Sequence, residues 1–131
     1  MELEQLAKYI VMKCEEERDP ITVTRLNFML YFLREKFGKE FGKELFKGKG
    51  IYGPKPSFHS VYMEYMKYGA LPIETHHGEE AWNQEMKRTK KELSNEEFQY
   101  LNQLITEYRK RDMYFLYKEY NDTTLKSWLI S

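Results

Sequence analysis

The sequence predicts an all-α fold, in which one compact domain of six or seven helices encloses an irregular middle segment rich in glycine and proline. A short β-hairpin in that segment is the only strand structure expected. Apolar residues recur at steps of three and four along most of the chain, which is the spacing that lines one face of a helix. Helix-capping residues separate these stretches. A length of 131 residues is close to the usual size of one domain, so residues 1–131 are expected to form a single unit.

The first two helices are predicted from continuous helical spacing. The apolar residues of the first are Leu3, Leu6, Ala7, Ile10, Val11 and Cys14. This helix should end before Asp19-Pro20, because proline disfavours a helical conformation in the residue before it. The second should begin at Thr22 or Thr24, which can cap it, and end at Gly38. Its middle, residues 28–33, is apolar on nearly all sides, which predicts a position in the centre of the fold.

Residues 37–56 contain five glycines and two prolines without sustained periodicity, so we expect irregular chain there. Gly48 to Gly53 matches the pattern G-x-G-x-x-G of dinucleotide-binding loops. That motif needs a buried strand before it and a helix directly after it, and neither is expected at this position. We interpret the glycines as turn residues. Gly53 should allow a turn that other residues disfavour, and Pro54 should fix the start of the third helix.

The third and fourth helices are predicted from weaker patterns. Ser57 is a candidate cap for the third, which should end at Gly69. Its apolar stripe consists of Phe58, Val61, Tyr62 and Tyr65. The charged segment 79–92 has helix-forming residues but few apolar ones, namely Ala81, Trp82 and Met86. We predict a helix there as well.

Two capping signals organise the rest of the chain. Ser94 to Glu97 matches the capping box, in which serine and glutamate side chains satisfy free backbone amides at the start of a helix. Asp112 should cap a short aromatic helix that contains Phe115, Leu116 and Tyr120. Thr123 or Thr124 should then begin a separate last turn that carries Trp128.

The balance of charges bears on whether the protein binds nucleic acid. The 21 basic and 21 acidic residues give a net charge of +0, whereas nucleic-acid binders are usually basic. Two basic clusters, residues 87–91 and 109–111, are flanked by acids and are interpreted as solvated faces. The first two helices, joined through Thr22, are similar to the opening of a helix-turn-helix domain, which keeps a nucleic-acid-binding regulator as the alternative function. The apolar middle of the second helix argues against its use as a recognition helix.

The apolar runs, the single cysteine and the histidines of the sequence constrain where the protein is located and which chemistry it can perform. Its longest apolar run, residues 28–33, is too short to span a membrane. A single cysteine, Cys14, and an amino terminus unlike a signal peptide predict a cytoplasmic protein. His59 and the adjacent His76 and His77 lack the spacing of a metal site, and no catalytic serine, histidine and acid can be assembled. We therefore expect no metal, no cofactor and no catalytic residue.

Several stretches match, in order and spacing, the motifs of one known family. They are Ala7 to Ile10, Ile21-Thr22, Leu26 to Phe32, Tyr52-Gly53-Pro54, Val61-Tyr62, Tyr68 to Ile73, Leu93 to Tyr108, and then Leu116, Thr123 and Trp128. Together they resemble the Panacea domain of SocA-like antitoxins and phage-associated proteins. The resemblance implies an all-helical antitoxin that neutralises a toxin by direct binding and is encoded by a prophage or mobile element. It implies no catalytic residues.

A partner surface is predicted on the third helix. Met63 and Met66 lie beside its apolar stripe together with His59, and Tyr52 lies just upstream. Methionine side chains adapt to irregular protein surfaces, so these four residues are the candidate toxin-binding site. The alternative is that the segment carrying Trp82 and Met86 packs over the methionines, which would make them part of the core.

Overall fold

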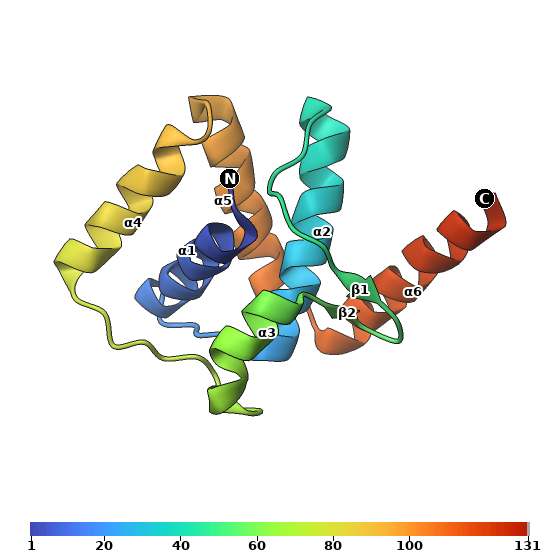
Figure 1. Ribbon diagram of the computed structural model, residues 1–131, viewed down its shortest axis with the longest axis horizontal. Coiled ribbons are helices and arrows are strands. Elements are labelled where there is room, and N and C mark those ends of the chain that lie inside the picture. The colour runs from blue at the N-terminus through green and yellow to red at the C-terminus, as the bar shows by residue number, and fades with distance from the viewer. Residues whose placement is uncertain (131) are drawn as a thin grey trace.

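The computed structural model describes the backbone of residues 1–130 and the side chains of residues 1–124. Within this part of the chain there are six α-helices, one 3-10 turn and one two-stranded hairpin, which confirms the predicted all-α bundle (Figure 1). Their bounds are α1 Leu3–Glu16, α2 Val23–Phe41, β1 Ile51–Tyr52, β2 Pro56–Ser57, α3 His59–Tyr65, η1 Met66–Tyr68, α4 Glu79–Lys91, α5 Asn95–Lys110 and α6 Met113–Ile130.

The start of α2 is as predicted, but its end is not. The Arg25 backbone N–H donates to Thr22 Oγ1 at 3.2 Å, so Thr22 is the cap. The helix continues past Gly38 to Phe41 and ends where Gly42 adopts a φ of 68°. A left-handed residue terminates a helix, and Gly42 has this conformation while Gly38 does not. The predicted end at Gly38 was therefore wrong by one turn.

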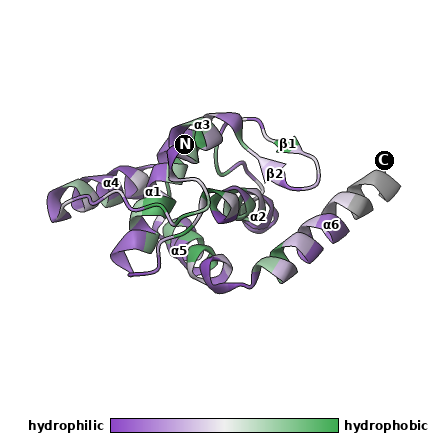
Figure 2. Ribbon diagram, turned by 90° about the horizontal axis from the view of Figure 1, so that it is seen from below, coloured by the Kyte–Doolittle hydropathy of each residue, from purple (hydrophilic) through white to green (hydrophobic). Residues whose placement is uncertain are grey.

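α2 is the central element of the fold. Every residue from Leu26 to Leu33 is buried, which covers all sides of two helical turns. Figure 2, in which α2 is seen nearly end-on, shows α3 and the hairpin on one side of it and α5 on the other. The aromatic rings of Phe32 and Tyr108 stack at 5.0 Å between α2 and α5. The prediction of a central second helix is confirmed.

The irregular middle segment contains the expected hairpin. β1 and β2 are antiparallel, with Ile51 opposite Ser57 and Tyr52 opposite Pro56. Ser57 thus belongs to a strand and does not cap α3. The residue before α3 is Phe58, whose backbone N–H donates to the buried Asn27 Oδ1 of α2 at 2.8 Å. The start of α3 is therefore fixed by a side chain of α2 and not by its own sequence.

The roles predicted for Gly53 and Pro54 were wrong. The φ of Gly53 lies outside the left-handed region, and a Cβ atom there would meet no atom within 4 Å. Pro54 is exposed, and strand β2 separates it from α3. Glycine is sterically required at Gly50, where a Cβ atom would lie 2.7 Å from the Tyr52 ring and 2.9 Å from the Phe58 ring, and at Gly48, where it would lie 2.9 Å from the Leu3 side chain. Gly53 contributes through its carbonyl oxygen, which accepts from the Tyr120 hydroxyl at 2.9 Å.

The carboxy-terminal half begins with α4 and α5, both at the predicted positions. The Ser94 capping box of α5 is complete, since Glu97 N–H donates to Ser94 Oγ at 3.1 Å and Ser94 N–H donates to Glu97 Oε1 at 2.8 Å. Asp112 accepts from the Tyr114 N–H at 2.8 Å at the start of α6.

α6 is one helix and not the two short ones predicted. The hydroxyl groups of Thr123 and Thr124 donate to carbonyl oxygens one turn earlier, those of Glu119 and Tyr120. Each threonine thus satisfies its hydroxyl within the helix and does not begin a new one. The side chain of Trp128 lies outside the residues whose side chains are described.

Removing the α5 cap should destabilise the protein without affecting recognition. We expect Ser94→Ala to lower the free energy of unfolding by about 1 kcal/mol, because the Glu97 amide loses its partner. Urea denaturation measures the loss. Ser60→Ala, at an exposed position in α3, is the control and should leave the midpoint unchanged. If the Ser94→Ala variant kept its full stability but no longer bound its partner, Ser94 would belong to the interface instead.

The two glycines of the hairpin should respond oppositely to alanine. Gly50→Ala places a methyl group against the Tyr52 and Phe58 rings, and Phe58 is fully buried, so we expect a loss of about 1–3 kcal/mol. Gly53→Ala meets open space and should cost less than about 1 kcal/mol. Thermal melts of both variants test this pair, and equal losses would contradict the assignment.

Candidate interaction surface

α3 divides into a buried stripe and an exposed apolar stripe. Val61 and Tyr65 are buried against the bundle. Tyr62, Met63 and Met66 are 45%, 55% and 48% exposed. With His59, which is also exposed, they follow the i, i+3, i+4, i+7 spacing of a single helix face, which ends at Met66, the first residue of η1. We call these four residues the α3 stripe.

Tyr62 corrects the sequence prediction, which placed it in the core stripe. A helix of seven residues has room for only one narrow buried face, and Phe58, Val61 and Tyr65 occupy it. Tyr62 lies 100° away from Val61 on the helix, on the side that faces solvent. The surface is therefore larger than the sequence indicated.

The alternative packing, in which the segment with Trp82 and Met86 covers the methionines, is not found. α4 lies along α1, as Figure 1 shows, and the Trp82 ring stacks on Tyr9 of α1 at 5.6 Å. Met86 packs against the core from the same helix. Because α1 takes the apolar side chains of α4, Met63 and Met66 remain uncovered by the described side chains.

The structure places Tyr52 near the start of α3 but in a different setting from the stripe. Its ring packs edge-on against Tyr31 at 5.2 Å and lies 6.2 Å from Phe58, and its hydroxyl accepts from Arg34 Nη1 at 3.1 Å. It is 42% exposed. Tyr52 thus offers one face of a fixed ring, while the methionines are free to change rotamer.

Other exposed apolar side chains were not predicted from the sequence to lie on the surface. Ile51 precedes Tyr52 in the hairpin and is 72% exposed, and Leu71 follows η1 and is 71% exposed. Phe115 on α6 is 56% exposed, although the sequence analysis placed it in an aromatic helix without assigning a face. Isolated apolar residues in short strands and loops carry no periodic signal, so only their exposure in the folded chain reveals Ile51 and Leu71.

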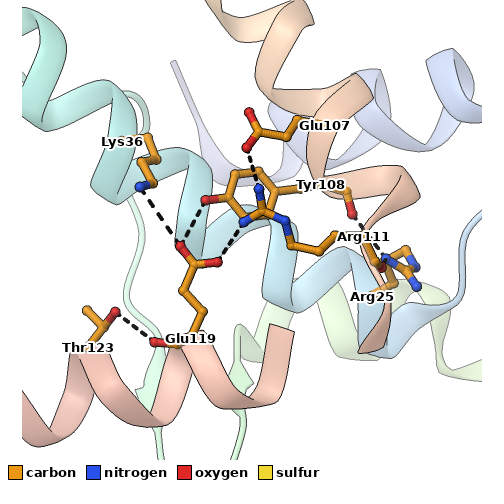
Figure 3. A network of polar contacts seen from close by, with 7 residues as sticks. All are labelled: Arg25, Lys36, Glu107, Tyr108, Arg111, Glu119 and Thr123. Atoms are coloured by element: carbon orange, nitrogen blue, oxygen red, sulfur yellow. Dashed lines mark hydrogen bonds and ion pairs between the residues drawn. The ribbon is translucent and has the colours of Figure 1, made fainter. Parts of the chain in front are cut away.

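The basic cluster at residues 109–111 is occupied by internal ion pairs. Arg109 is buried and pairs with Glu17 and with Asp19 Oδ2, the latter at 3.1 Å. Arg111 pairs with Glu107 and with Glu119 Oε2, the latter at 2.7 Å (Figure 3). Both guanidinium groups are paired within the fold, so of this cluster only the exposed Lys110 has no ion-pair partner among the described residues.

The cluster at residues 87–91 is also partly engaged. Thr89 is fully buried, and Arg88 Nη1 lies 3.6 Å from the buried carboxylate of Glu85. The middle of α2, which a helix-turn-helix reading would place in a DNA groove, is buried throughout. A recognition helix must expose its side chains to base edges, so α2 cannot act as one in this fold.

Carboxylates of α1 hold the loop between η1 and α4. Glu15 accepts from the Thr75 N–H at 2.6 Å and from the His76 N–H at 2.9 Å. Burial alone would raise the pKa of Glu15, but these hydrogen bonds outweigh it and hold the pKa below its ordinary value. Burial alone would also raise the pKa of Glu17, but hydrogen bonds from Lys13 and Arg109 hold that pKa below its ordinary value.

Comparisons of the chain with protein-family models, with curated proteins and with solved structures find no match. None of the helices in the described part of the chain combines the length and apolar character that a bilayer crossing requires.

Acid should destabilise this protein through the α1 carboxylates. Because the folded state lowers the pKa of Glu15 and Glu17, their contribution is fully present above the unfolded value of about 4.3 and is lost as pH falls through the lower folded values. Urea unfolding from about pH 7 to pH 3 should show this decline. Glu17→Gln should make it shallower, whereas Glu44→Gln, at an exposed position, should not. An unchanged slope in Glu17→Gln would contradict the assignment.

Proposed function

We propose that this chain is an antitoxin-like protein that neutralises a partner toxin by direct binding, and that a prophage or mobile element encodes it. Two points support the proposal. The chain resembles the Panacea domain family in the order and spacing of its motifs. The observation that carries the proposal is the α3 stripe, in which Tyr62, Met63 and Met66 stand exposed on one face of a helix anchored in the core.

The chemistry of the stripe suits protein recognition. Tyrosine and methionine are enriched in protein interfaces, where they bury a large apolar area. The thioether side chains of Met63 and Met66 can adapt to the shape of a partner, while the helix behind them is fixed through Val61 and Tyr65. A rigid support with adaptable contacts limits the entropy lost on binding.

A protein partner is favoured over a nucleic acid on grounds of charge. Arg109 and Arg111, which could have met phosphates, are paired with carboxylates, and the chain has no net charge. The stripe itself is apolar. Binding by an apolar surface changes little with salt, whereas phosphate binding weakens steeply, so a salt titration of the isolated complex separates the two functions.

Co-expression with the neighbouring gene tests the proposal directly. The adjacent reading frame should be toxic when expressed alone and harmless when expressed with this chain, and the two proteins should co-purify. A neighbour that is harmless alone, or a toxin that stays toxic in the presence of the folded chain, would overturn the proposal.

Met63→Asp should separate recognition from folding. Met63 is 55% exposed, so the isolated variant should keep its melting temperature within the change that about 0.5 kcal/mol produces. Binding of the toxin should weaken by about tenfold or more, because the interface would have to desolvate a charge. Protection against the toxin in cells and calorimetric titration both measure the loss.

Phe115→Asp is the matched control for Met63→Asp. Phe115 has nearly the same exposure, 56%, but lies on α6, away from the stripe. It should leave both stability and toxin binding unchanged. If Met63→Asp unfolds the protein, or if both variants bind the toxin equally well, the α3 stripe is not the docking surface.

A further inference from the structure

A small pocket lies between α1 and α3 on the flank of the α3 stripe. Its volume is about 220 Å³, and Ala7 and Val61, both 1% exposed, form an apolar floor. Ser60 on its α3 side is one helical turn from Met63, so the pocket opens beside the methionine. Ligand pockets for drug-sized molecules have about 300–1,000 Å³, which makes this one suited to a single amino-acid side chain.

The rim of the pocket is acidic. Glu4 from α1 and Glu64 from α3 line it, both are exposed, and neither has an ion-pair partner among the described residues. Lys8 also lines the pocket and is exposed, and its Nζ lies 3.8 Å from the buried Glu85 Oε2, which Arg88 Nη1 approaches at 3.6 Å. The rim therefore carries two carboxylates and one ammonium group, which leaves it with a net negative charge.

Tyr65 adds a polar group to the wall. Burial, and to a lesser degree the carboxylates of Glu64 and Glu85, raise the pKa of its phenol to about 12. The hydroxyl is therefore neutral at physiological pH and can accept a hydrogen bond. Within the part of the chain whose side chains are described, the Tyr65 hydroxyl has no hydrogen-bond partner, and Tyr65 lines the pocket.

We propose that this pocket anchors an arginine side chain of the protein that docks on the α3 stripe. The inference rests on the proposed function and names the chemistry of the partner. The apolar stem of the arginine would lie on Ala7 and Val61. Its head would meet the carboxylates of Glu4 and Glu64 and the hydroxyl of Tyr65.

Arginine fits this arrangement better than lysine. A guanidinium group is planar and carries five donors in a fixed fork, so it can reach acceptors on two helices at once. The ammonium group of lysine is a point charge with strong hydration. Arginine is also enriched among the side chains that contribute most to protein interfaces, where it is typically placed next to apolar contacts such as Met63.

The pocket can be tested without the toxin. The probe is Nα-acetyl-arginine amide, titrated into the isotope-labelled full chain and followed by NMR, with the citrulline analogue as an uncharged control of the same shape. We expect saturable shifts at the amides of Ala7, Val61 and Tyr65 with the arginine compound and none with citrulline. The lysine compound should bind more weakly.

Two variants complete the test. Glu64→Gln should weaken binding of the arginine probe about three- to fivefold, the range for a partly exposed ion pair, and Glu44→Gln should not change it. Equal shifts with arginine and citrulline, no saturable shift up to the solubility limit, or equal affinity in Glu64→Gln would overturn the inference. A circular dichroism melt verifies that each variant is folded.

The same variants distinguish this inference from the proposed function. If Met63→Asp abolishes toxin binding while Glu64→Gln leaves it unchanged, the docking surface stands and the arginine anchor is overturned. If the probe binds but the chain neutralises no toxin in the co-expression test, the pocket recognises arginine and the proposed function fails.

Discussion

The burial of α2 on all sides is the constraint on which the rest of the structure depends. No single neighbour could cover the continuous apolar segment from Leu26 to Leu33, so α1, α3, α5, α6 and the hairpin each take part of its surface. Aromatic contacts set where each of them lies. Phe32 stacks on Tyr108 of α5 at 5.0 Å, and Phe28 meets Tyr120 of α6 edge-on at 5.7 Å. Rings of this size fill space between helices and prefer such offset and edge-on geometries.

Polar side chains of α2 then fix the backbone at the start of α3 and at the end of α5. Asn27 donates to the carbonyl of Val23 at 2.8 Å and accepts from the Phe58 amide, which sets the start of α3. Arg25 donates to the carbonyl oxygens of Tyr108 and Arg111 at 3.0 and 2.5 Å, which supplies partners at the end of α5 (Figure 3). Arg109 and Arg111 likewise use their charge inside the fold, in ion pairs with Glu17 and Glu119. The apolar outer stripe of the short helix α3 is not covered by any of the described side chains.

Local chemistry accounts for the features that were predicted correctly from the sequence. The cap of α2 at Thr22 and the capping box at Ser94 each depend on residues within one turn, so their positions can be read directly from the chain. The same is true of the central helix, because a segment that is apolar on every side must be buried. Met63 and Met66 were recognised as candidates because they lie outside the core stripe of their helix.

Contacts between residues far apart in the sequence decided the features that were not predicted. The role of Gly50 follows from two rings that reach it only in the folded chain, while Gly53, more conspicuous in sequence, lies in open space. The sequence by itself determined which segments are helical and which helix is central, since capping and periodicity are local properties of the chain. Only the tertiary structure decided that α4 packs on α1, leaving Met63 exposed, and that an acidic pocket opens beside it. The physical reason is that burial depends on which surfaces meet, and short amphipathic segments such as α3 and α4 fit more than one partner.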